Sequence, residues 1–99
     1  MLYWASPSTM RVIAIVNGQT TVVLLDTGST HNFIDETLAK TLKLSTDVES
    51  NFRMRVANGQ VIRTLGECKE VKFKMQGLHL KLTFNLLELG GCGIVLGTQ

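Results

Sequence analysis

The sequence predicts an all-β domain, a barrel or a sandwich with one short helix, and three features support this fold class. Short segments of strand length, aliphatic or alternating in polarity, recur along the chain. Asn-Gly pairs at 17–18 and 58–59 separate such segments, and this pair is the strongest signal of a two-residue hairpin turn. One stretch, residues 32–42, has the apolar spacing of a helix.

The first predicted hairpin follows a lead-in. Residues 1–9, which contain the only proline, are interpreted as a lead-in segment, and residues 10–99 as the domain. The β-branched and aliphatic residues 10–16 predict a strand, and residues 20–25 predict the strand that returns from the turn. The second strand becomes apolar on both faces toward its end, as expected of a buried strand.

A short helix is predicted after a tight turn through residues 26–29. Asn32 can cap its N-terminus, and Asp35 at the third helical position interacts favourably with the helix dipole. Three aliphatic residues four apart form one apolar stripe on this helix. They are Ile34, Leu38 and Leu42.

A second Asn-Gly hairpin is predicted beyond the helix. The polar segment 45–51 is expected to be a loop. Residues 54–57 and 60–64 then form the two strands on either side of the turn at 58–59.

A third hairpin and a final strand complete the predicted all-β domain. Residues 71–75 and 78–84 alternate apolar with polar side chains around the turn at 76–77, the pattern of a sheet with one wet face. A glycine-rich bend then leads to the aliphatic strand 94–96, which Gly97 closes.

Composition favours a small domain that associates with a partner subunit. The chain has 99 residues, enough for one domain. A domain of this size buries roughly two-thirds of the surface of its unfolded chain and is marginally stable alone. Apolar residues make up 44%, whereas charged residues make up 18%, below the usual share of about a quarter. The surplus apolar surface would be covered by a second copy.

Charge and cysteine content exclude several classes of function. The net charge of +2 is too small to favour nucleic acid or an acidic membrane as a partner. Lys72, Lys74 and Lys81 are interpreted as a solvated face that protects a sheet edge. Cys68 and Cys92 lack metal-ligand spacing and are interpreted as reduced thiols. No signal peptide or membrane-spanning run is recognised, so a cytoplasmic protein is expected. The two histidines and two cysteines are too scattered to suggest a metal site, and no cofactor is expected.

The segment Asp26-Thr27-Gly28-Ser29 carries the clearest chemical signal. The buried strand before it holds Asp26 at a loop, Gly28 permits close approach of other backbone, and the hydroxyls of Thr27 and Ser29 can orient a carboxylate. Peptide hydrolysis by carboxylates needs one group to take a proton from water and another to polarise the carbonyl. Two carboxyl groups a few ångström apart can share the one proton that this division of labour requires.

The second carboxylate is expected from a second copy of the chain. The sequence has three aspartates, Asp26, Asp35 and Asp47, and neither of the last two lies in another Asp-Thr/Ser-Gly. An identical Asp26 related by a two-fold axis is the simplest supply. The sequence therefore predicts a homodimer.

A family resemblance covers nearly the whole chain. Residues 24–34, which include the Asp26 motif, resemble the active-site segment of retropepsins, particularly those of plant-like gypsy-type long-terminal-repeat retrotransposons. Residues 54–59 are similar to the flap hairpin of that family, and residues 94–97 to its hydrophobic-hydrophobic-Gly element. The resemblance implies an all-β fold, a small closed barrel of the retropepsin type with one short helix. It also implies an aspartic endopeptidase that processes the polyprotein of a retroelement, in the cytoplasm or within retroelement particles.

The resemblance further implies the roles of individual residues. Asp26 is catalytic, and Thr27 forms a hydrogen-bond grip across the dimer. The other residues that support the active-site loop are Gly28, Ser29, Leu96 and Gly97. The flap that closes over a peptide substrate consists of Val56, Ala57, Asn58, Gly59 and Gln60.

The chain departs from the family pattern at two places. Gly93 stands where family members commonly have an acidic residue, and a modest structural cost is expected there. Retropepsins normally continue past the position of Gln99 into a short helix and a terminal strand that helps to hold the dimer. The domain is therefore interpreted as truncated at its C-terminus.

Two other functions compete with the protease hypothesis. A retropepsin-like domain can serve as a non-catalytic dimerisation or scaffolding module, and the sequence leaves that alternative open. A serine hydrolase built on Ser29 and His31 is disfavoured, because near neighbours in sequence rarely reach the required geometry and no orienting carboxylate is evident.

Overall fold

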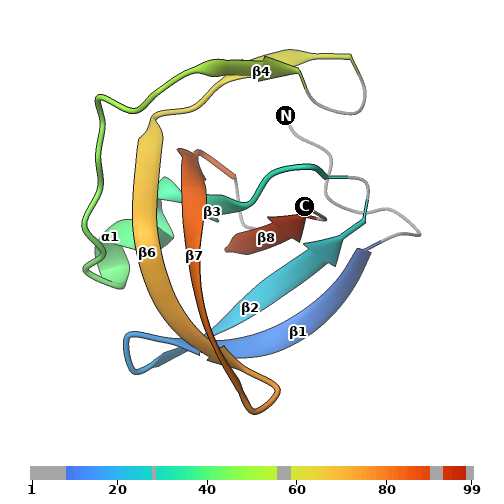
Figure 1. Cartoon of the computed structure of the whole chain (residues 1–99), viewed down its shortest axis with the longest axis vertical. Helices are drawn as coiled ribbons and strands as arrows, with labels where there is room; N and C mark the ends of the chain where they lie inside the picture. Colours follow the sequence, from blue (N-terminus) through green and yellow to red (C-terminus); the bar gives the residue numbers. More distant parts are fainter. Residues whose placement is uncertain (1–8, 28, 56–58, 90–92, 98–99) are drawn as a thin grey trace.

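The predicted closed barrel with one short helix is confirmed in a computed structural model, which describes residues 9–27, 29–55, 59–89 and 93–97. In these ranges, strands in the order β1-β2-β8-β3-β7-β6 close on themselves, and β4 and β5 form a separate two-stranded sheet. Figure 1 shows the β4–β5 pair extended outside the barrel wall. The elements are β1 (Thr9–Val16), β2 (Gln19–Asp26), β3 (Phe33–Asp35), α1 (Glu36–Thr41), β4 (Arg53–Arg55), β5 (Val61–Arg63), β6 (Gly66–Met75), β7 (Leu78–Leu87) and β8 (Ile94–Gly97).

The first hairpin forms as the Asn-Gly signal predicts. Val16 pairs with Gln19, so Asn17 and Gly18 are the two turn residues. Their φ angles are 52° and 80°, and positive φ at both positions is what a type I′ turn requires. The turn fixes the register of β1 against β2 over their full length, from Val16 opposite Gln19 to Thr9 opposite Asp26.

The barrel interior is a single apolar cluster. Side chains from β1, β2, β3, α1, β6, β7 and β8 meet in it, and Phe73 packs edge-on against Phe84 with ring centroids 5.8 Å apart. Burial of these side chains removes apolar surface from water and is the main force that closes the barrel. Its largest fully buried members are Phe84, Ile34, Leu42, Ile94, Val16 and Val23.

The helix begins later than predicted, and Asn32 does not cap it. Residues 33–35 instead form β3, which pairs with both β7 and β8. Asp35 is the N-cap of α1, and its Oδ2 accepts a hydrogen bond from the Leu38 N–H at 3.1 Å. Both Asn32 and Asp35 are good capping residues. Strand pairing decided between them, because it holds residues 33–35 in extended backbone.

The lysines of the β6–β7 hairpin are solvated, as predicted, but they do not protect an edge. Lys72 lies opposite Lys81, and Lys74 lies opposite His79, all on the exposed outer face. Strand β6 pairs with β1 and β7, while β7 pairs with β6 and β3. Closure of the barrel therefore leaves these two strands with a neighbour on each side.

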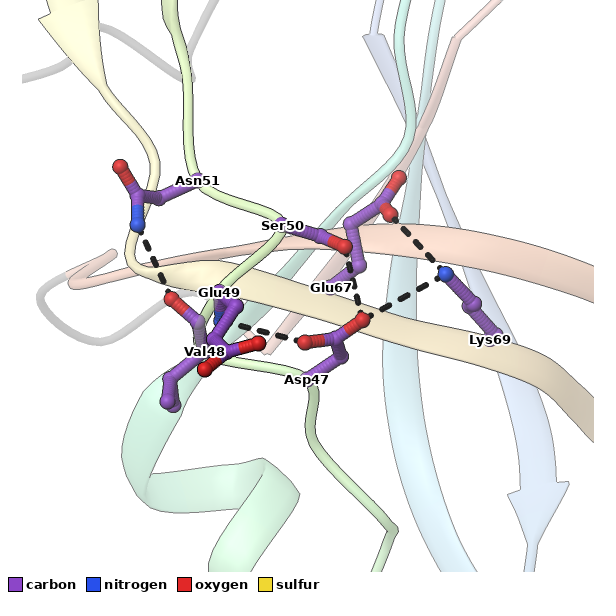
Figure 2. A network of polar contacts seen from close by, with 7 residues as sticks. All are labelled: Asp47, Val48, Glu49, Ser50, Asn51, Glu67 and Lys69. Atoms are coloured by element: carbon purple, nitrogen blue, oxygen red, sulfur yellow. Dashed lines mark hydrogen bonds and ion pairs between the residues drawn. The ribbon is translucent and has the colours of Figure 1, made fainter.

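The predicted loop 45–51 is anchored to β6. Asp47 and Glu67 exchange two backbone hydrogen bonds of 2.8 and 3.0 Å. The Asp47 carboxylate accepts hydrogen bonds from the Ser50 hydroxyl at 2.7 Å and from the Glu49 N–H at 3.1 Å, and Lys69 Nζ lies 3.4 Å away (Figure 2). In that order these contacts hold the pKa of Asp47 below its ordinary value. The loop leads directly into β4, so the anchor fixes the start of the β4–β5 sheet.

Candidate active site

Asp26 is the last residue of β2 and lies between two neighbouring strands. Its Cα is paired with Thr9 of β1 on one side and with Gly97 of β8 on the other. The side chain is half-buried. The chain turns at once, because the Ser29 N–H donates to the Asp26 carbonyl oxygen at 3.1 Å. A carboxylate is thus held at the rim of a rigid sheet. Gly28, which was predicted to shape this turn, lies outside the described residues.

The end of β8 packs directly against the loop that follows Asp26. A Cβ at Gly97 would lie 2.5 Å from the Ser29 carbonyl oxygen and 2.7 Å from that of His31. No other residue fits there without moving backbone. Leu96 is buried and pairs with Leu25. Leu96 and Gly97 therefore lie beside the loop, and their supporting role in catalysis stays a prediction.

The Ser29 hydroxyl is engaged with the backbone of its own loop. It donates to the His31 carbonyl oxygen at 2.7 Å and lies 3.3 Å from the His31 N–H. The His31 ring instead has its Nδ1 2.9 Å from the Thr30 hydroxyl. This geometry braces the loop and does not place the imidazole on the serine, which argues against a serine nucleophile. Thr27 is exposed at the start of the loop.

Asn32 is a functional candidate that sequence analysis missed. Its side chain is only 4% exposed, and its Oδ1 accepts a hydrogen bond from the Gly97 N–H at 3.0 Å. Its carbonyl oxygen accepts from the Asn85 backbone N–H at 2.8 Å and from the Asn85 side-chain amide at 3.1 Å. One residue therefore ties the active-site loop to both β8 and β7. These partners are more than 50 residues away in sequence, so no local pattern announces them.

Strands β4 and β5 form the arm that sequence analysis predicts as a flap. Met54 and Ile62 belong to a second apolar cluster with Phe33, Leu87, Leu89, Val95 and Leu24, which joins the arm to the barrel. Phe52, just before β4, has its ring centroid 6.4 Å from that of His31. The arm is thus fixed on the same side of the molecule as the loop after Asp26.

The structure describes two of the five predicted flap residues, Gly59 and Gln60. Val56, Ala57 and Asn58 lie outside the described residues. Gly59 has a φ of 84° and its carbonyl oxygen accepts a hydrogen bond from the Arg55 guanidinium at 3.0 Å. Gln60 is exposed.

Neither of the other aspartates is available to complete a dyad within one chain. Asp35 accepts hydrogen bonds from the N–H groups of Leu38 and Leu89, at 3.1 and 2.9 Å, and so links α1 to the end of β7. Asp47 is held in the loop anchor by Ser50. Both carboxylates are therefore engaged in hydrogen bonds with segments other than the turn that carries Asp26.

The described ranges contain neither a candidate metal site nor a candidate membrane-spanning helix. Among the described residues, no group of three or more His, Cys, Asp or Glu side chains is placed to hold a metal ion. Within them, none of the helical structure is long and apolar enough to cross a membrane. Cys68 is a buried free thiol, and burial raises its pKa. Cys92 lies outside the described part of the chain.

The closed barrel, the arm that packs beside it and the Asp-Thr-Gly turn at the end of β2 define a retropepsin-like domain. The family profile described as aspartyl protease matches residues 12–97, and the chain belongs to that family. The fold and the family profile therefore agree, and the Asp26 motif lies within the matched residues.

A solved structure with the same architecture is the retroviral protease-like domain of Ddi1 from Leishmania major. The match has a TM-score of 0.68 and 14% sequence identity, and it covers 90% of this chain and 69% of that chain. At this identity the likeness concerns the fold. No curated protein sequence gives a significant match.

Proposed function

We propose that two copies of this chain form an aspartic endopeptidase, with Asp26 of each copy as one half of the catalytic dyad. The observation that carries the proposal is the position of Asp26. It ends a barrel strand, it begins a loop packed on Gly97, and the other two aspartates are bound elsewhere. Membership of the aspartyl protease family supports the same chemistry.

The proposed reaction is direct attack of water on the peptide carbonyl. One Asp26 carboxylate takes a proton from the water while the water oxygen bonds to the carbonyl carbon. The partner Asp26, which enters protonated, polarises the carbonyl oxygen. The C–N bond then breaks and the nitrogen leaves with a proton from the dyad, so that two carboxyl groups and one shared proton are restored. Neither a covalent intermediate nor a metal is required by this route.

The arm would supply the other half of the substrate site. An extended peptide can bond its backbone to a hairpin while alternate side chains enter pockets. We assign this contact to residues 56–60, which would close over the peptide and exclude water. The contacts of Met54 with the barrel and of Phe52 with His31 support the placement of the arm next to the Asp26 loop.

We further propose that the substrate is the polyprotein of a long-terminal-repeat retroelement, cleaved in the cytoplasm or within retroelement particles. This assignment rests on the similarity of residues 24–34 to the gypsy-type retropepsins. It is separable from the chemistry, because the dyad would cleave any peptide that fits the site.

The test compares cleavage by the wild type with cleavage by Asp26→Asn. The wild type should hydrolyse members of a hydrophobic peptide library over roughly pH 4 to 7, a range in which a carboxyl dyad can hold one proton. A statine-type transition-state mimic should block the reaction. Asp26→Asn should lose the activity while its circular dichroism spectrum and unfolding midpoint remain those of the wild type.

Glu49→Gln is the matched control, because it also turns a carboxylate into an amide, at an exposed side chain, and should leave the cleaved products unchanged. Equal inertness of the wild type and Asp26→Asn would contradict the enzyme. If such an inert protein still dimerised, the scaffolding alternative would replace it.

A further inference from the structure

We propose that the outer face of β1, β6 and β7 carries a docking groove for an extended acidic peptide segment with aliphatic side chains. The groove has a volume of about 410 Å³. We call it the basic groove, and it is lined by Ile15, Lys72, Phe73, Lys74, His79, Leu80 and Lys81. The inference does not depend on proteolysis, because the groove would serve an enzyme or a scaffold equally.

The basic groove gathers cations in an arrangement that costs the isolated fold stability. Lys72 and Lys81 are direct cross-strand partners on one face, and Lys74 is opposite His79. Like charges directly opposite each other in a sheet are destabilising. Residues two apart on a strand lie about 7 Å apart on the same face. The four side chains therefore stand at the corners of a small rectangle of N–H donors.

Little negative charge from the chain itself offsets these lysines. Glu70, in the bulge of β6, lies 3.7 Å from Lys81 and is 77% exposed. Within the described ranges, neither Lys72 nor Lys74 takes part in an ion pair. An external anion would thus find two unneutralised ammonium groups side by side.

Exposed aliphatic side chains border the cations. Ile13 and Ile15 point outward from β1 with 58% and 45% of their surface exposed, and Ile15 pairs with Lys74. Leu78 at the start of β7 is 62% exposed. Apolar residues beside a cationic array favour a ligand with both carboxylates and aliphatic groups. The lining has no arginine, and its one phenylalanine, Phe73, is only 4% exposed and offers no stacking surface, so the groove fits a peptide better than a nucleic acid.

The geometry also favours recognition through side chains. The three strands under the basic groove are already paired within the closed barrel, so a peptide cannot join them as an added strand at this face. An extended peptide presents alternate side chains about 7 Å apart, which matches the spacing of Lys72 and Lys74. Two acidic residues separated by one residue would reach both ammonium groups.

The basic groove is remote from Asp26. On β1, Thr9 is opposite Asp26, whereas Ile15 is opposite Thr20. Six residues of extended strand span about 20 Å. Figure 1 shows the β6–β7 turn and the β1–β2 turn at one end of the barrel, and the end of β2 directed away from them. A segment bound in the groove would leave the Asp26 loop open.

Fluorescence anisotropy with a labelled peptide of about ten residues that alternates Glu with Val tests the docking site. The protein carries Asp26→Asn throughout, which prevents cleavage of the probe and should itself leave binding unchanged. The acidic peptide should bind and weaken as salt is raised, whereas the same peptide with Lys in place of Glu should not bind. Added Lys72→Glu and Lys74→Glu should weaken binding by about tenfold or more.

The matched control is Lys40→Glu with Lys43→Glu, which makes the same change in net charge at the end of α1 and should bind within about twofold of the unaltered protein. Ile13→Ser with Ile15→Ser should also weaken binding, because it removes the aliphatic side chains beside the lysines. Unchanged affinity would overturn the aliphatic part of the proposal. Equal affinity of the groove and control variants would overturn the proposal. Tighter binding of a single-stranded RNA or of anionic vesicles through the same lysines would overturn it in favour of those partners.

Discussion

At the scale of single residues, Gly97 and Asn32 hold the loop that begins at Asp26. Gly97 allows β8 to touch the carbonyl groups of the loop, and the Asn32 side chain accepts the hydrogen bond of the Gly97 N–H. Both contacts act on backbone, which is the part of the loop that sets the direction of the Asp26 carboxylate.

Gly97→Ala should destabilise the fold and reduce cleavage. The added methyl group would stand 2.5 Å from the Ser29 carbonyl oxygen, so the loop or β8 must move. Overpacking of this kind costs about 1–3 kcal/mol. Urea denaturation gives the stability loss, and kcat for a peptide substrate should fall more than the loss of folded protein explains.

Gly77→Ala is the stability-matched control for that change. Its φ of 79° makes alanine unfavourable by about 1–2 kcal/mol, yet the methyl group would meet nothing within 4 Å. Figure 1 shows the β6–β7 turn, which contains Gly77, at the end of the barrel away from the end of β2. The kcat of Gly77→Ala should therefore be unchanged. A parallel fall of kcat in both variants would mean that Gly97 acts on stability alone.

Asn32→Ala should cost about 1–3 kcal/mol, because it leaves the partly buried Gly97 N–H without its acceptor. Asn51→Ala removes an amide that contacts Val48 and Arg63 at the surface, and it should cost less than about 1 kcal/mol. Thermal unfolding of the two variants checks the order. Equal losses would show that the Asn32 contact does not restrain the loop.

Asp26 and Asn32 were not equally predictable from the sequence. Asp26 is recognisable because its motif is contiguous and follows a buried strand. Asn32 was misassigned as a helix cap, since its partners Thr83, Asn85 and Gly97 come from distant strands and only the folded barrel brings them together.

At the scale of elements, the loop anchor at Asp47 sets where the arm begins. Its backbone bridge to Glu67 and its side-chain bond from Ser50 tie the segment before β4 to the barrel. Gly66 makes the close approach possible, because a Cβ there would lie 2.5 Å from the Asp47 carbonyl oxygen.

The contribution of Asp47 to stability should disappear in acid. Its pKa is lowered in the folded state, chiefly by the Ser50 hydroxyl, so the folded protein resists protonation of this carboxylate more than the unfolded chain does. The contribution is complete above the ordinary value of 3.8 and is lost as pH falls through the lowered one. The urea midpoints of the wild type and Asp47→Asn should differ at about pH 6 and converge as the pH falls below the ordinary value of 3.8 and through the lowered pKa.

Glu49→Gln removes the same charge two residues along and is the control for that experiment. Equal urea midpoints of the wild type and Asp47→Asn at every pH would assign the anchor to the backbone bridge alone.

Hairpins were the most predictable elements. The turns at 17–18 and 76–77 carry their own chemistry, since Asn17, Gly18, Gln76 and Gly77 all adopt positive φ. The start of α1 was less predictable, because Asn32 and Asp35 are both good capping residues. The strand β3 follows Asn32 directly, so the helix begins after Asp35. Local sequence determines a turn, whereas the competition between a helix and a strand is decided by tertiary pairing.

At the scale of the whole molecule, barrel closure depends on pairings that no hairpin dictates. Strand β8 runs parallel to β2 and antiparallel to β3, and β3 runs parallel to β7. These contacts join residues 52 or more positions apart (Phe33 with Asn85, for example), so the alternation of side chains predicts an all-β domain but not its strand order. The same limit applies to a dyad shared by two chains, which only association can assemble.

Mixing active and inactive subunits tests whether the dyad is shared. If each site needs one Asp26 from two copies, wild type equilibrated with an equal amount of Asp26→Asn will form mixed dimers in which one carboxylate is replaced by an amide. Random pairing among fully dimeric chains should then reduce activity per wild-type subunit to about half. At protein concentrations where dissociation dominates, added Glu49→Gln should instead raise the activity per chain that carries Asp26, because it supplies competent partners. Activity that stays proportional to the number of chains that carry Asp26 under both additions would mean that each subunit works alone, and a second carboxylate would have to be sought among the glutamates of the same chain.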